Sequence, residues 1–233
     1  MKAADTPCFA GEAVAVPRYL RDTYWWAYVD PRAVRLFERQ WLVNVILWGN
    51  FGRLRDAALD GLGASLRGRT LQIACVYGDL TRKLLERHAS GAQLDVLDVL
   101  PVQLDNLARK LPPRAAVGMI HADSTRLDIA PASYDRAVLF FLLHEQPEQA
   151  RRATLAEALR VVKPGGSLVI VDYHRPPRTH PLYYPMVAIL RTLEPFALDL
   201  WRHEITEWLP PGVGRLEKTT LFGGLYQVVR ITA

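Results

Sequence analysis

RTLQIACVYGDLTRKLLERHASGAQLDVLD, residues 69–98, is the stretch that decides the expected fold. An apolar run at residues 70–75 predicts a short buried strand, and a tight turn follows it. Residues 80–88 have the apolar spacing of a helix, and a second apolar run, residues 93–99, contains Asp98. Strand, turn, helix and strand in this order predict the first half of a nucleotide-binding βαβ unit.

The turn of this unit lacks most of the glycines that nucleotide-binding loops use. Such loops have three glycines, which let the backbone approach the ligand, but here Ala74 and Val76 occupy the first two positions and only Gly78 remains. Tyr77 places a phenol where a small residue is usual, and we expect it to point into the pocket. Asp79 starts the following helix, either as its N-cap or as a carboxylate beside the ligand. The pocket is therefore either blocked or holds its ligand in an unusual way.

Asp98 is expected to bind the nucleoside part of such a ligand. It lies roughly 20 residues beyond Gly78, at the end of the second strand, where a carboxylate can accept both hydroxyls of a ribose. The alternative is a structural carboxylate that caps the helix beginning near Pro101.

Further polar residues follow later strands, at the edge of the sheet where ligands bind. His144 and Glu145 come after the fourth expected strand, and residues 172–174, Asp-Tyr-His, end the fifth. A lone histidine is often a buried structural residue, and at this position a reactive one is equally expected. Imidazole and carboxylate groups suit Mn or Mg, but this spacing is no metal signature, so no metal ligands are assigned.

The rest of the chain continues the alternation of strands and helices. Strands are expected at residues 70–75, 93–99, 115–121, 134–142 and 167–173, with helices at 80–88, 102–111 and 148–162 between them. Two β runs joined at Gly223 and Gly224 predict a C-terminal hairpin. The fold class is therefore α/β, with a doubly wound, mostly parallel seven-stranded sheet.

Two helical segments lie outside this alternation. Residues 1–66 predict an aromatic-rich N-terminal extension that serves as a substrate lid, with one helix from Asp30 through Trp48 and another at 54–66. Residues 67–233 form the main domain, with a helical insert at about 181–209 that Pro185 and Pro195 interrupt. Their aromatic side chains suit a lid packed on the sheet, walls for a flat apolar substrate, or a membrane interface.

Composition limits the classes of function. Arginines are spread through the chain, so the net charge of +5 does not indicate nucleic-acid binding, although it favours attraction to an anionic membrane surface. We find neither a secretory signal nor an apolar run that would span a bilayer. Cys8 and Cys75 are far apart, which indicates a reducing compartment rather than a disulfide framework.

Residues 69–174 resemble the class I methyltransferases that use S-adenosylmethionine (SAM). The resemblance is carried by Gln72, Gly78, Asp98, Asp123, Asp135 and the VVKPGG turn at residues 161–166. It implies that Asp98 binds the ribose of SAM and that Asp123 meets the adenine amino group, whereas Asp135 is structural. The cofactor-binding set is then Ala74, Val76, Tyr77, Gly78, Asp98 and Asp123.

Nearly the whole chain is similar to a narrower family, the rhodoquinone-biosynthesis (RquA) proteins. The motifs are YWWAYVDP at residues 24–31, WGN at 48–50, VYGD at 76–79 and FGGLYQ at 222–227. This resemblance implies conversion of ubiquinone to rhodoquinone, in which an amino group replaces a ring methoxy group. SAM would supply the nitrogen and Mn would assist. It also implies a cytoplasmic protein, peripheral at the inner face of the membrane, with a lipophilic substrate and no nucleic-acid partner.

The altered loop offers a physical reason for such chemistry. Methyl transfer requires the methyl group in line with its acceptor, at about 3–3.5 Å. Bulk at Ala74, Val76 and Tyr77 would displace the methionine part of SAM and present its α-amino nitrogen instead. Asp79, His144 and Tyr77 are the expected catalytic residues, with Asp79 or His144 taking the proton. The alternatives are an ordinary methyltransferase acting on a small or lipid acceptor, and a silent binding module that excludes SAM.

Overall fold

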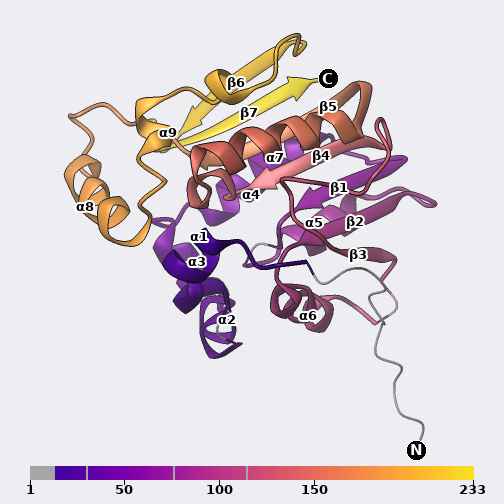
Figure 1. Cartoon of the computed structure of the whole chain (residues 1–233), viewed down its shortest axis with the longest axis horizontal. Helices are drawn as coiled ribbons and strands as arrows, with labels where there is room; N and C mark the ends of the chain where they lie inside the picture. The colour runs from indigo at the N-terminus through magenta and orange to yellow at the C-terminus, as the bar shows by residue number, and fades with distance from the viewer. Residues whose placement is uncertain (1–13, 30, 76, 114) are drawn as a thin grey trace, which may run out of the picture.

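The computed structural model describes residues 14–29, 31–75, 77–113 and 115–233. Its centre is a seven-stranded sheet in the order β3-β2-β1-β4-β5-β7-β6, in which β7 runs antiparallel to both neighbours. The strands are β1 (Arg69–Ile73), β2 (Gln93–Asp98), β3 (Val117–His121), β4 (Tyr134–Phe140), β5 (Val162–Tyr173), β6 (Leu216–Leu221) and β7 (Tyr226–Thr232). The expected α/β sheet and its C-terminal hairpin are confirmed (Figure 1).

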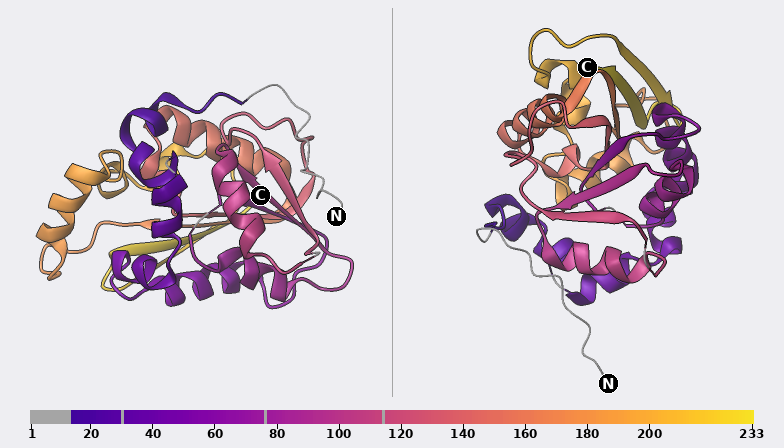
Figure 2. Two further views of the ribbon diagram at one scale, coloured as in Figure 1. Left: turned by 90° about the horizontal axis from the view of Figure 1, so that it is seen from below. Right: turned by 90° about the vertical axis from the view of Figure 1, so that its right-hand side faces the viewer.

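Helices cover both faces of the sheet, which explains why most side chains of its central strands are buried. The helix α7 (Glu148–Val161) lies on one face, and α4 (Phe51–Leu62) and α5 (Leu80–Arg87) lie on the other (Figure 2). On the central strand β1, Leu71 and Ile73 are fully buried. A further helix, α6 (Pro101–Lys110), contacts β2 and β3.

The N-terminal extension is broken into more pieces than expected. It consists of α1 (Arg18–Thr23), a π-helix (Trp25–Val29), α2 (Pro31–Phe37) and α3 (Gln40–Ile46). The single helix expected through Trp48 was wrong, because Arg39 is extended, with ψ of 115°. The carboxylate of Glu38 accepts hydrogen bonds from Asn106 and Lys110, so a tertiary contact replaces helix continuity. Asp30, the expected N-cap, lies outside the described residues.

The second N-terminal helix also differs from its expected bounds. It was expected at residues 54–66, whereas α4 begins at Phe51 and ends at Leu62. Gly63 follows with φ of +121°, a conformation that is open to glycine and ends the helix there.

The expected insert contains α8 (Tyr183–Leu193) and α9 (Asp199–Arg202). Pro195 separates these helices, as expected, but Pro185 does not interrupt α8. It occupies the first turn, where a backbone N–H has no partner within the helix, so its absence costs no hydrogen bond. In Figures 1 and 2, α8 projects from the body of the molecule, at the same end as the N-terminal extension.

In the described part of the chain, no helix combines the length and hydropathy needed to cross a bilayer. Cys75 is a free thiol, and Cys8 lies outside the described residues.

Candidate functional site

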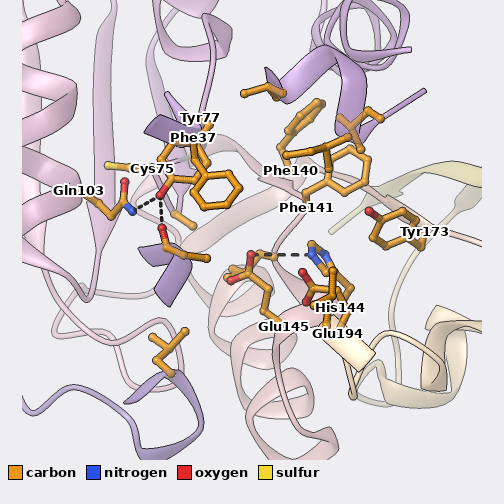
Figure 3. A pocket seen from close by; sticks show the side chains of 18 of the residues that line it. Phe37, Cys75, Tyr77, Gln103, Phe140, Phe141, His144, Glu145, Tyr173 and Glu194 are labelled. Carbon is orange, nitrogen blue, oxygen red and sulfur yellow. Dashed lines mark hydrogen bonds and ion pairs between the residues drawn. The ribbon is translucent and has the colours of Figure 1, made fainter. Parts of the chain in front are cut away.

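A cavity of about 590 Å³ lies at the carboxyl edge of the sheet. Its walls come from the N-terminal extension, the turn after β1, the ends of β2 and β4, and α8. Most of the lining is apolar, but polar side chains gather in two places, which Figure 3 shows on separate sides of the cavity. One group lies near Cys75 and Asp98, and the other surrounds His144.

Asp98 and Asp123 both line this cavity, at the end that adjoins β2 and β3. Asp98 is only 7% exposed, and its carboxylate accepts backbone N–H groups of Cys75 at 2.7 Å and Leu100 at 2.8 Å. Burial raises the pKa of Asp98 to about 6, although these hydrogen bonds oppose the shift. The Oδ1 atom of Asp123 accepts the backbone N–H of Thr125 at 2.8 Å. Two carboxylates thus line the same end of the cavity.

The turn after β1 has, at Ala74, a backbone conformation that is typical of glycine. Ala74 has φ of +74°, a region that residues with a Cβ rarely adopt and that typically costs about 1–3 kcal/mol. Its side chain lines the cavity. Gly78, with φ of +92°, has another role, because a Cβ there would collide with the ring of Phe51. Val76 lies outside the described residues.

Tyr77 lines the cavity and also ties the turn to the N-terminal extension. Its hydroxyl donates to the backbone carbonyl of Ala27 at 2.6 Å and accepts from Nε2 of Gln103 at 3.1 Å. Its ring stacks on Phe37, with the ring centroids 6.0 Å apart (Figure 3). The side chain therefore holds the extension against the turn as well as filling space in it.

Asp79 points away from this centre. Both oxygens of its carboxylate lie 2.9 Å from Nη1 of Arg55, and it does not line the cavity. It also makes no side-chain capping hydrogen bond to α5. The structure thus separates Asp79 from His144.

His144 and Asp172 lie together at the other polar end. His144 Nδ1 is 3.0 Å from Asp172 Oδ1, in an ion pair that is not aligned well enough for a hydrogen bond. Burial alone would lower the pKa of His144, but the Asp172 carboxylate, with more distant Glu194 and Glu145, raises it to about 9. His144 is therefore an imidazolium at neutral pH. His174 points elsewhere, with Nδ1 2.7 Å from the carbonyl oxygen of Gly224.

Two residues of this end were missed by sequence reasoning. Glu194, which follows α8, lines the cavity, and burial raises its pKa. Tyr24, which follows α1, is fully buried and interacts electrostatically with Glu194. Glu194 belongs to no motif and follows no strand, and Tyr24, although it opens the YWWAYVDP motif, follows no strand either, so the sequence carried no signal that they meet His144.

These side chains do not fit a bound Mn ion. Asp172 already accepts the backbone N–H groups of Leu143, His144 and Tyr173 at 2.9, 3.2 and 2.8 Å. Within the described ranges, no three His, Cys, Asp or Glu side chains are grouped so that they could hold a metal ion. We therefore derive no step through a metal.

The pKa of Asp98 gives a testable pH dependence. An ionised carboxylate accepts hydrogen bonds from both ribose hydroxyls, whereas its protonated form loses part of that capacity. The pKa is raised in the folded protein, so the acid is neutral below about pH 6. We expect the affinity for SAM, measured by calorimetry, to be constant near neutral pH and to fall as pH drops below that value. An affinity that stays constant down to pH 5 would show that Asp98 does not contact the ligand.

Comparisons with known proteins agree with this architecture. Residues 70–166 match the family model described as a methyltransferase domain. Demethylmenaquinone methyltransferase of Clavibacter sepedonicus is 36% identical over 145 residues, which are 60% of this chain and 57% of that protein. The 2-methyl-6-phytyl-1,4-hydroquinone methyltransferase of Synechocystis is 29% identical over 171 residues, 72% of this chain and 51% of that protein. The chain thus spans little more than half the length of these two relatives.

Among solved structures, human N-acetylserotonin methyltransferase in complex with SAM superposes with a TM-score of 0.64. The match covers 92% of this chain and 62% of that one, at 14% identity, and so bears on the fold alone. Residues 70–166 are therefore similar to a methyltransferase domain, and the chain has the fold of this SAM-dependent methyltransferase.

Proposed function

We propose that this protein is a SAM-dependent transferase that acts on the ring of an isoprenoid quinone and converts ubiquinone to rhodoquinone. The observation that carries the proposal is the combination of two features in one cavity. Asp98 and Asp123 line one end of the cavity, where we propose that the nucleoside binds, while Ala74 and Tyr77 fill the turn that would hold the methionine part. The resemblance of the turn and the N-terminal motif to the rhodoquinone-biosynthesis proteins supports the choice of product.

The filled turn bears on which group is transferred. Methyl transfer depends on in-line alignment at about 3–3.5 Å, so a displacement of the methionine part by one side chain is enough to prevent it. The ring of Tyr77 cannot swing aside freely, because its hydroxyl is held by Ala27 and Gln103. A methionine part displaced in this way would bring its α-amino nitrogen toward the centre of the cavity. SAM is then a nitrogen donor rather than a methyl donor.

His144 supplies the matching activation of the acceptor. An imidazolium that hydrogen bonds to a ring carbonyl withdraws electrons from the carbon that bears the methoxy group. The amine nitrogen forms a bond to that carbon, and the methoxy group leaves as methanol with the proton of the amine. Release of the amino group then breaks the bond between the nitrogen and the α-carbon of the donor by elimination: the β-carbon gives up a proton, a double bond forms between the α- and β-carbons, and the nitrogen leaves with the bonding electrons and takes up a proton.

The structure alters the proposed source of acid and base. Asp79 forms an ion pair with Arg55 outside the cavity, so it is not placed to accept the proton of the amine. His144 already carries a proton on its ring, so it cannot accept that proton either. Glu145, which lines the cavity with its Oε1 3.8 Å from His144 Nε2, is placed to relay the amine proton.

The mouth of the cavity suits a lipid-soluble substrate. Large apolar side chains of α3 and α8 and of the turn after α3 are exposed there: Val45, Ile46, Trp48, Ile189 and Leu193. We propose that they receive an isoprenoid tail at the surface of a membrane, with the protein bound peripherally at the inner face. Tryptophan is well suited to the boundary between head groups and acyl chains.

Labelled SAM tests the proposed reaction. We expect purified protein, incubated with a short-chain ubiquinone and SAM labelled at the amino nitrogen, to give rhodoquinone that carries the label, as identified by mass. Parallel reactions with and without Mn would show whether the metal is needed. Unlabelled rhodoquinone would eliminate SAM as the nitrogen donor.

Ring methylation is the second candidate, because two relatives with matching sequence are named as methyltransferases of a demethylated menaquinone and of a hydroquinone. The same incubation with methyl-labelled SAM distinguishes it. Transfer of labelled methyl to a quinol, without amination, would replace the first proposal with this one. Failure of SAM to bind at all would leave a binding module instead.

A further inference from the structure

We infer that Phe141, the residue that follows β4, contacts the flat ring of the acceptor face to face and orients it beside His144. The inference rests on the proposed function, since it concerns the ring that such a site would hold. It adds a residue that determines how this ring lies in the cavity.

The backbone of Phe141 has a conformation that large side chains rarely adopt. Its φ is +54°, in the left-handed region, where a residue with a Cβ is strained. The neighbouring strand holds it there, because the Phe141 N–H donates to the carbonyl oxygen of Val171 at 2.8 Å. Two residues further on, the Leu143 N–H donates to the carboxylate of Asp172 at 2.9 Å, which fixes the rest of the turn. Strained residues that persist in this way are concentrated at binding and active sites, so the ring of Phe141 is a candidate ligand contact.

The left-handed conformation also brings two successive aromatic rings to the same cavity. In a regular strand, successive side chains point to opposite faces of the sheet. Here Phe140 and Phe141 both line the cavity, and their ring centroids are 5.1 Å apart (Figure 3). Phe140 is only 2% exposed, whereas Phe141 is partly buried, so the ring of Phe141 is the one that a ligand can reach.

The rings that surround Phe141 meet it edge to face. Its ring plane makes angles of 79° with His144 and 77° with Tyr173, at centroid distances of 5.9 and 5.4 Å. Phe140 and Tyr226 are inclined to it in the same way, by 73° and 77°. Among the described residues, therefore, no ring lies parallel to that of Phe141 and against it. A parallel, offset stack is a favourable arrangement for flat π systems, and it is open to the ring of a ligand.

The place of Phe141 in the cavity determines which flat ring it can hold. The adenine of SAM is flat as well, but Asp98 and Asp123 line the other end of the cavity, where the nucleoside is proposed to bind. A ring stacked on Phe141 lies next to His144 instead, within reach of the group proposed to contact its carbonyl oxygen. A nucleophile approaches a flat ring from one of its two faces. With one face covered by Phe141, the ring presents only the other face to the donor, so stacking also sets the direction of attack.

Substitution of Phe141 tests the inference through the affinity for a short-chain ubiquinone. A titration of tryptophan fluorescence measures it, with SAM left out so that no turnover occurs. Phe141→Met keeps an apolar side chain of similar size but removes the flat ring, so we expect the affinity to fall about 2- to 10-fold, the effect of one aromatic contact. Phe141→Tyr keeps the ring and should retain the wild-type affinity. Both variants should bind SAM as the wild-type protein does, which shows that they fold and that the nucleoside end is intact.

Phe222 provides the matched control. It is also a phenylalanine with a left-handed backbone, with φ of +51°, but it lies between β6 and β7 and does not line the cavity. Phe222→Met should therefore leave the affinity for the short-chain ubiquinone unchanged.

The outcomes separate this inference from the function on which it rests. Wild-type affinity for ubiquinone in Phe141→Met, or an equal loss in Phe141→Tyr or Phe222→Met, would overturn the inference while leaving a quinone-ring substrate in place. A loss of affinity for SAM in Phe141→Met, with ubiquinone binding unchanged, would assign the ring to adenine and would also overturn it. If the wild-type protein bound no ubiquinone, with or without SAM, the proposed function itself would fail.

Discussion

Replacing Asp98 with asparagine is expected to weaken SAM binding by about 10- to 100-fold, because hydrogen bonds to a charged group are worth about 1.5–3 kcal/mol. The carboxylate is buried, lines the cavity and also accepts the backbone N–H groups of Cys75 and Leu100. Asparagine keeps the shape but offers one acceptor oxygen, so either a ribose hydroxyl or a backbone N–H loses its partner. Calorimetric titration near neutral pH measures the change.

Asp95 provides the matched control on the same strand. Its carboxylate binds Arg69 and the hydroxyl of Tyr134, each at 2.9 Å, and does not line the cavity. Asp95→Asn should leave the affinity for SAM unchanged. If Asp98→Asn bound SAM as tightly as the wild-type protein, the assignment of this end of the cavity to a nucleoside would be wrong.

Replacing Arg151 with methionine is expected to lower the free energy of unfolding by about 3–5 kcal/mol. Arg151 is fully buried and donates to the carbonyl oxygens of Leu143 at 3.0 Å, Gln146 at 2.8 Å and Phe196 at 3.1 Å. Its guanidinium also lies 4.2 Å from the ring centroid of Trp208. Methionine fills most of the volume but leaves buried carbonyl groups without donors, each of which is unfavourable.

The same substitution should loosen the segment that follows α8, because two of these contacts join α7 to residues of the insert. Urea unfolding measures the stability. The affinity for a short-chain ubiquinone should also fall, because Glu194 lines the cavity and lies close to Phe196 in sequence. Arg202→Met is the control, as this arginine is 63% exposed in its side chain and pairs with Asp199 on the same short helix. It should change stability by less than about 0.5 kcal/mol. Equal stability of the wild type and Arg151→Met would refute the anchoring role.

Much of the fold was predictable because its signals are local. Each strand of the parallel sheet contains an apolar run, and β1 through β4 lie close to the expected bounds, whereas β5 begins earlier than expected, at Val162. Two of the failed predictions have a tertiary cause. The helix expected through Glu38 is broken because that side chain is used by Lys110 and Asn106, which belong to another helix. Asp79 was expected either as a capping side chain or beside the ligand, but its carboxylate is bound by Arg55 outside the cavity.

By itself, the sequence determined that the core strands alternate with helices and run parallel, and thereby the edge of the sheet where Asp98, Asp123 and His144 lie. The pattern of apolar residues that marks a strand or a helix extends over only a few residues, so it can be recognised without knowing any long-range contact. Only the tertiary structure decided that Glu194 and Tyr24 join His144 and that Tyr77 is held by the N-terminal extension. These contacts depend on how segments with no shared periodicity pack against one another, and that packing is fixed by shape and hydrogen bonding across the whole molecule.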